Sequence, residues 1–78
     1  MTKLAIISPS DMIRILTHLG FREQRQHGSH IYFRHPDGRT TVIPYHKGED
    51  LGRGLIRKIL RDIGISPDEY EQLRQRVL

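Results

Sequence analysis

The chain has 78 residues, of which 36% are apolar and 28% are charged, and its 13 Lys and Arg against 9 Asp and Glu give a formal net charge of +4. This length allows one small domain, residues 1–78, and the absence of Cys excludes a disulfide framework, a thiol nucleophile and a Cys-based zinc site. The longest apolar run, residues 4–7, is too short for a membrane span or a signal peptide, so we expect a cytoplasmic protein without a membrane partner. The basic balance favours an anionic partner, of which nucleic acid is the usual one.

Three helices are predicted from capping residues and apolar spacing. Ser8 and Ser66 each precede a proline. A Ser hydroxyl at the N-cap accepts a hydrogen bond from a free backbone N–H of the first turn, and proline at the first helical position loses no helical hydrogen bond. The first helix is expected to end at Gly20, the second to run from Gly52 or Arg53 to Gly64, and the last to be a short helix from Pro67. Their predicted core residues are Met12, Ile15, Leu16 and Leu19, then Leu55, Ile56, Ile59, Leu60 and Ile63, then Tyr70, Leu73 and Val77.

Between the first two helices the period changes to that of strands. Ile31 and Phe33 alternate with polar residues, and a turn at 36–38 separates them from a β-branched run that ends at Pro44. We predict three antiparallel strands at about residues 21–26, 30–35 and 39–45, although the first is polar throughout. The predicted fold is α+β, of order α-β-β-β-α with a terminal helix, in which the helices cover one face of the sheet.

Five His residues are the first candidates for chemistry. A metal site would need three or four of them to converge, but His30 and His35 are an odd number of residues apart and point to opposite faces of one strand. We therefore expect no metal. His18 and His35 are interpreted as solvated or hydrogen-bonded side chains.

His30 differs because Gly28 and Ser29 precede it at the head of a predicted strand, where a tight bend can aim the next side chain. An imidazole beside cations is what phosphodiester transesterification requires, with Arg22, Arg25 and Arg34 as the nearby cations. RNA supplies its own 2′-OH nucleophile, so neither a Ser nucleophile nor a metal is needed. For a second acid or base the sequence leaves His27, His46, Tyr32 and water open.

Two further features have alternative interpretations. A basic stripe on the second helix, Arg53, Arg57, Lys58 and Arg61, is equally consistent with phosphate contact and with a solvated face. Tyr32 and Tyr45 would stack on bases if they lie on the open sheet face, and core packing is as good an account of Tyr45.

Several short motifs in sequence order resemble the HicA toxin family over about residues 10–72. They are Gly20-Phe21, Gly28-Ser29-His30, Pro36-Asp37-Gly38, residues 42–46, residues 51–60 and residues 64–66. The resemblance implies a fold like the double-stranded RNA-binding domain. It also implies a metal-independent, cofactor-free ribonuclease that cleaves single-stranded regions of mRNA, arrests translation and is held inactive by a HicB-type antitoxin.

The family's catalytic His maps onto His30, and His46 matches a recurrent family position that is either structural or substrate-contacting. His27 and Gly54 depart from the residues most common in the family. The expected RNA contacts are Arg22, Arg25, Gly28, Ser29, Tyr32, Arg34, His46, Lys47, Arg53 and Arg57. Two other functions fit the same residues, namely a non-enzymatic RNA-binding module and an interaction domain whose basic helix docks an acidic partner.

Overall fold

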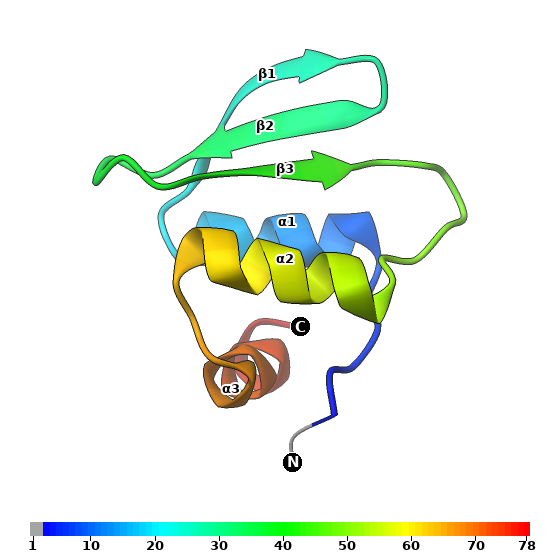
Figure 1. The fold of residues 1–78 in the computed structure, drawn as a ribbon, viewed down its shortest axis with the longest axis vertical. Coiled ribbons are helices and arrows are strands. Elements are labelled where there is room, and N and C mark those ends of the chain that lie inside the picture. The colour runs from blue at the N-terminus through cyan, green and yellow to red at the C-terminus, as the bar shows by residue number, and fades with distance from the viewer. Residues whose placement is uncertain (1–2) are drawn as a thin grey trace.

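The computed structural model describes residues 3–78, so the first two residues of the predicted domain lie outside the described part of the chain. Its elements follow in the order α1 (Pro9–His18), β1 (Arg22–His27), β2 (His30–Arg34), β3 (Thr40–Pro44), α2 (Arg53–Ile63) and α3 (Pro67–Val77). The strands form one antiparallel sheet in the order β1-β2-β3, and the helices lie to one side of it (Figure 1). The predicted α-β-β-β-α order is confirmed, and each strand lies within one residue of its predicted limits.

The helices begin and end where the capping residues predicted. The hydroxyl of Ser8 accepts a hydrogen bond from the backbone N–H of Asp11 at 3.1 Å, and Ser66 forms a reciprocal capping box with Glu69. At the end of α2, Gly64 adopts a left-handed φ of 75°, a conformation that a side chain would strain. These local signals fix the length of the helices independently of their packing.

The core lies between the sheet and the layer formed by α1 and α2. Ile31 and Phe33 of β2 and Ile43 of β3 are buried against apolar side chains of the two helices. The helical core residues are Met12, Ile15 and Leu16 on α1 and Ile56, Ile59, Leu60 and Ile63 on α2, whereas Leu19 and Leu55 are half-buried. Because side chains alternate along a strand, burial of Ile31 and Phe33 directs the residues between them to the opposite, open face.

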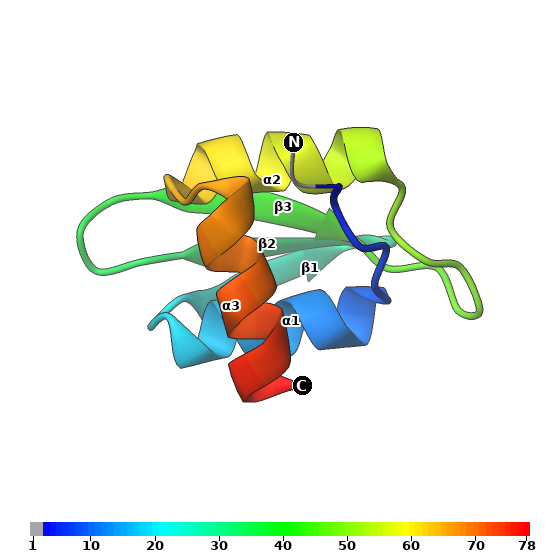
Figure 2. The same ribbon diagram turned by 90° about the horizontal axis from the view of Figure 1, so that it is seen from below.

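The third helix crosses α1 and α2 on the side away from the sheet (Figure 2). It has 11 residues and begins at Pro67, as predicted. Tyr70 is fully buried and its hydroxyl donates to the carbonyl of Ala5 at 2.6 Å, and this burial raises the pKa of Tyr70 to about 12. Leu73 and Val77, which were predicted to be buried with it, are only partly covered.

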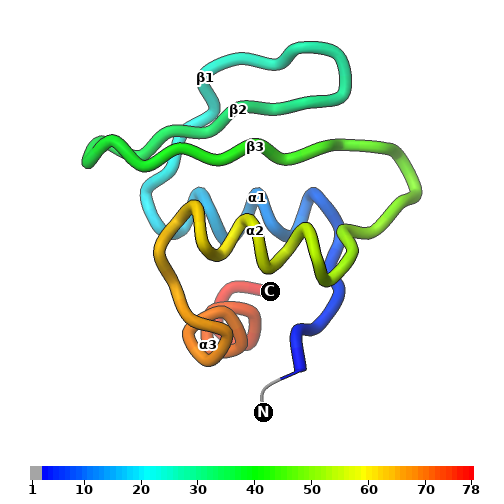
Figure 3. Tube along the Cα trace, viewed as in Figure 1, coloured from blue at the N-terminus to red at the C-terminus, as the bar shows by residue number. Residues whose placement is uncertain are grey.

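The position of β1 at the exposed edge of the sheet accounts for its polar sequence. All six of its residues are exposed, and in the Cα trace it is the strand farthest from α2 and α3 (Figure 3). It lies beyond the helices and all six of its side chains are polar, so neither of its faces contributes to the core. A polar edge strand also resists pairing with other chains.

Candidate active site on the open sheet face

The strand register assembles the residues of the uncovered face, which we call the open face. Residues paired across antiparallel strands point to the same side of the sheet, so the partners of each outward residue of β2 are also outward. Three rows result: His27, His30 and Pro44; then Arg25, Tyr32 and Val42; then Arg22, Arg34 and Thr40. None of these positions carries Asp or Glu, so the open face is basic.

A bulge in β1 places both Arg22 and Arg25 on the open face. Arg22 and Arg25 are an odd number of residues apart, and in a regular strand they would point to opposite faces. The register shifts between Glu23 and Arg25, so that Arg22 pairs with Arg34 and Arg25 pairs with Tyr32. The extra residue, Gln24, thus brings both arginines to the open face.

His30 begins β2 immediately after the hairpin turn at Gly28 and Ser29. Gly28 has a φ of 60°, and a positive φ at the first turn position followed by a negative one is the pattern of a type II′ hairpin turn. The carbonyl of Ser29 accepts a hydrogen bond from the backbone N–H of Tyr45 at 2.6 Å, which ties the turn to the end of β3. The His30 side chain is exposed, and within residues 3–78 no side-chain hydrogen bond or ion pair engages its imidazole.

The row next to His30 carries a stacked pair. The guanidinium of Arg25 lies over the ring of Tyr32, with 4.5 Å between the guanidinium carbon and the ring centroid. The ring of Tyr32 is half-buried and lies on the open face, as base stacking would require. This stacked pair occupies the row next to His30 and His27.

The third row lies at the other end of the strands. Arg34 is the last residue of β2, four positions along the strand from His30 and about 13 Å from it. Arg22 and Arg34 line a shallow hollow with Gln24. The structure therefore does not bring these two arginines beside His30, but it does place them on the same face.

His35 follows β2 and is held in the fold. Its Nε2 lies 3.1 Å from the carbonyl of Leu19, and its Nδ1 accepts the backbone N–H of Asp37 at 3.1 Å. Its ring meets the ring of Phe21 edge to face, with 5.0 Å between centroids. The interpretation of His35 as a hydrogen-bonded histidine is confirmed, and the same contacts remove it from the candidate site.

Arg39 completes that end of the sheet. It pairs with Asp37 at 2.9 Å, donates to the carbonyl of Ile63 at the end of α2 and lies over the ring of Phe21. Its hydrogen bonds to the Asp37 carboxylate lower the pKa of Asp37 to about 2. The turn between β2 and β3 is thus tied to the end of α2 through Arg39 and to the end of α1 through His35.

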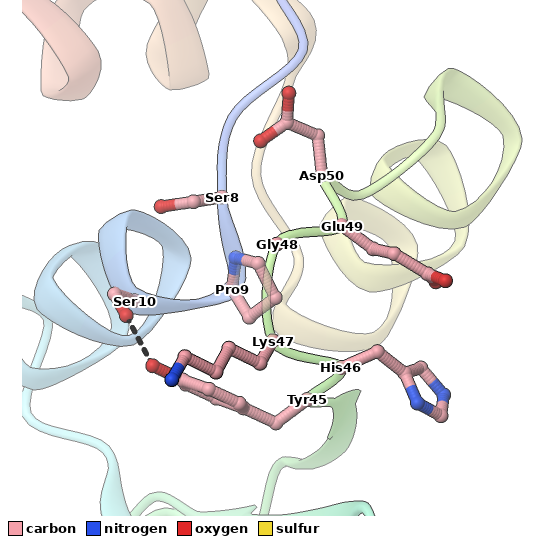
Figure 4. A pocket seen from close by; sticks show the side chains of 9 residues that line it. All are labelled: Ser8, Pro9, Ser10, Tyr45, His46, Lys47, Gly48, Glu49 and Asp50. Carbon is pink, nitrogen blue, oxygen red and sulfur yellow. Dashed lines mark hydrogen bonds between the residues drawn. The ribbon is translucent and has the colours of Figure 1, made fainter.

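The loop after β3 borders a cavity of about 200 Å³ at the start of α1 (Figure 4). Tyr45 and Ser10 share a hydrogen bond of 2.7 Å at its edge. Tyr45 is exposed and does not pack in the core. Figure 4 shows that Lys47 extends toward this pair whereas the ring of His46 points away from it. No sequence pattern predicts the part played by Ser10, because it is distant in the chain from Tyr45.

The predicted helical cations lie in another layer. Arg53 and Arg57 are exposed on α2, on the helix side of the sheet (Figure 1). Arg53 also donates to the carbonyl of Leu4 at 2.9 Å, which holds the segment before α1 against α2. The structure does not bring these two residues together with His30.

Within residues 3–78, no three His, Cys, Asp or Glu side chains gather where they could hold a metal ion. In the same range, no helix combines the length and the apolar character needed to cross a membrane.

A family model described as the HicA toxin of bacterial toxin-antitoxin matches residues 9–65. This range contains the sheet, α1 and α2, and therefore all of the open face. No protein of curated function matches the chain.

Proposed function

The chain belongs to the HicA toxin family of bacterial toxin–antitoxin systems, and on that premise we propose that it is a metal-independent endoribonuclease that cleaves single-stranded regions of mRNA. His30 is the proton-transfer residue, and the arginines of the open face are the phosphate partners. Cleavage of mRNA in the cytoplasm arrests translation. A HicB-type antitoxin is the partner that covers the open face and holds the toxin inactive.

The observation that carries this proposal is the exposed imidazole of His30 on a basic face. It begins β2 beside the Arg25–Tyr32 pair, and no position paired with it on the open face is acidic. An imidazole side chain can both accept and donate a proton, as general acid–base catalysis requires. Cations nearby offset the negative charge that develops at phosphorus.

The chemistry follows from the substrate. The ribose 2′-OH attacks the adjacent phosphorus, the bond from phosphorus to the 5′-oxygen breaks, and the products are a 2′,3′-cyclic phosphate and a 5′-OH. The imidazole of His30 transfers a proton during this exchange. Because RNA carries the nucleophile, the reaction needs neither a Ser hydroxyl nor a metal-bound hydroxide.

Two details support RNA as the substrate. Arg22 and Arg34 are paired directly across the strands, an unfavourable arrangement for like charges that a bound phosphate would relieve. The guanidinium of Arg25 over the ring of Tyr32 offers a planar surface on which an unpaired base can stack. Unpaired bases of this kind occur in single-stranded RNA.

The test is incubation of the purified protein with an end-labelled mRNA fragment in the presence of EDTA. We expect shortened products that end in 2′,3′-cyclic phosphate. An intact RNA that migrates as a complex would instead identify a non-enzymatic RNA-binding module. Cleavage that requires an added divalent metal would contradict the proposed mechanism.

The toxin role is tested in cells. Expression of the chain alone is expected to arrest growth, and co-expression with a HicB-type antitoxin is expected to restore it. Normal growth with abundant folded protein would count against the proposal.

A further inference from the structure

The structure places a second imidazole directly across from His30. His27 ends β1, His30 begins β2, and the two are register partners on either side of the Gly28–Ser29 turn. The Cα atoms of such a pair lie about 4.5 to 5.5 Å apart, and both side chains stand on the same face. His27 is exposed, and within the described residues its imidazole, like that of His30, has no side-chain hydrogen bond or ion pair.

The other groups considered for a second proton transfer are less well placed. Tyr32 stands in the next row with the guanidinium of Arg25 over its ring. His46 lies in the loop after β3, two residues beyond Pro44, and has no register partner in the sheet. On the open face, His27 is therefore the titratable side chain in the same row as His30.

The surroundings of the pair are simple. The third member of its row is Pro44 of β3, which has no ionisable group, and the next row contributes the charge of Arg25 and the hydroxyl of Tyr32. The helices lie on the opposite side of the sheet, so no helix packs against the two imidazoles. One phosphate can therefore approach both rings from solvent.

Resting on the proposed ribonuclease function, we propose that His27 is the second catalytic residue of the site. One of the two imidazoles, in its neutral form, accepts the proton of the 2′-OH as the bond from the 2′-oxygen to phosphorus forms. The other, in its protonated form, donates a proton to the 5′-oxygen as its bond to phosphorus breaks. The proton count balances, and the two imidazoles end the step with their protonation states exchanged.

The positions of the two imidazoles are compatible with one acting as base and the other as acid. In an in-line displacement the attacking and leaving oxygens lie on opposite sides of phosphorus, so one ring cannot contact both at once. Two side chains rooted on neighbouring strands, each free to rotate, can reach the two sides of one phosphate. A single His30 would have to rely on water for the other transfer.

The experiment compares single-turnover cleavage of a labelled RNA by the wild type and by His27→Ala, His27→Gln and His27→Lys over about pH 5 to pH 9, the range in which imidazoles titrate. His18→Ala, which removes an exposed His from α1, is the matched control, and His30→Ala is the reference for loss of activity. Binding of the same RNA with 2′-O-methyl groups, which block cleavage, is measured in parallel.

We expect His27→Ala and His27→Gln to slow cleavage by roughly 10²- to 10³-fold, as loss of a general acid or base does, while binding changes little. The wild type should show a bell-shaped pH profile, and these variants should lose one of its two limbs. His27→Lys should keep RNA affinity, but its cleavage should remain slow, because a lysine ammonium with a pKa of about 10.4 holds its proton at neutral pH.

Two results would overturn the inference in different ways. If His30→Ala is inactive while His27→Ala cleaves at the wild-type rate with both pH limbs, His27 is not catalytic but the ribonuclease proposal stands. If the wild type itself does not cleave RNA, the ribonuclease proposal fails and the inference fails with it.

Discussion

His30 begins β2 and His35 follows its last residue, yet the protein holds these two histidines in opposite ways. The imidazole of His35 is bonded through both nitrogens and packed against Phe21, and Arg39 and Asp37 close the turn around it. The imidazole of His30 stands exposed beside a two-residue turn whose contact with the rest of the sheet is made by the backbone of Ser29 and Tyr45.

This difference distinguishes a histidine that stabilises the fold, His35, from one that is free to act on a substrate, His30. A histidine whose two nitrogens are engaged cannot exchange a proton with a substrate without breaking a bond that holds the fold. A histidine whose position is set by its backbone keeps both nitrogens for a substrate. The comparison predicts that substitution at one end of β2 costs activity and substitution at the other costs stability.

The largest expected effect is that of His30→Ala on activity. Cleavage should fall by at least about 10²-fold, the contribution typical of a proton-transfer residue, while the thermal unfolding midpoint stays within about 2 °C of the wild type. The measurement pairs RNA cleavage with thermal unfolding followed by circular dichroism. Cleavage that survives in purified His30→Ala would remove His30 from the mechanism.

His35→Ala should give the opposite result. It removes a hydrogen bond to the carbonyl of Leu19 and leaves that group without its partner, which costs about 1 to 3 kcal/mol of unfolding free energy. In a domain of this size the unfolding midpoint falls by about 4 to 8 °C per kcal/mol. Cleavage per folded molecule should be retained.

His18→Ala is the control for that measurement, because the side chain is exposed on α1 and its loss should leave stability within about 0.5 kcal/mol. An unchanged midpoint for His35→Ala would show that the contacts around this histidine contribute little. A loss of cleavage in the folded variant would extend the active site to the far end of β2.

A smaller effect tests whether the far end of the open face contacts RNA. Arg34→Gln should weaken binding of an uncleavable RNA and reduce the slope of log affinity against log salt by about 0.7, as expected for one phosphate contact on a single strand. The rate at saturating RNA should not change, because this residue lies a strand's length from His30. Arg14→Gln, on α1, is the matched control, and equal slopes for both variants would confine the RNA to the His30 end.

The smallest effect concerns acid stability. Arg39 lowers the pKa of Asp37 to about 2 from its usual 3.8, so the folded state favours the carboxylate. The resulting stabilisation is present above about pH 4 and is lost as the pH falls toward 2. Asp37→Asn should flatten this part of the stability profile in thermal unfolding between about pH 5 and pH 2, whereas Glu23→Gln, on the exposed strand β1, should not.

The fold was predictable because its signals are local. Ser8 and Ser66 mark helix starts through hydrogen bonds that reach three residues along the chain, and Ile31 and Phe33 mark the buried face of β2 by alternation. Strand β1 has no such pattern, since its residues bury nothing. Its pairing with β2 is what defines it.

The arrangement of the site was only partly predictable, because it depends on register. The sequence places Arg22 and Arg25 near each other, but only the bulge at Gln24 puts both on the open face. Alternation correctly separates His30 from His35, yet the partner of His35 is the carbonyl of Leu19, 16 residues away. Such contacts follow from the packing of α1 against the sheet and have no local signature.

The hydrogen bond from Tyr70 to the carbonyl of Ala5 joins residues 65 positions apart. On the ribosome, the segment before α1, which contains Ala5, emerges long before the helix that carries Tyr70, and at 5 to 20 residues per second the delay is about 3 to 13 s. During that interval the sheet, α1 and α2 can fold, but the segment around Ala5 still lacks its contact with Tyr70 of α3. A newly made molecule therefore completes this side of its structure last, well after the hairpin that carries His30 has been synthesised.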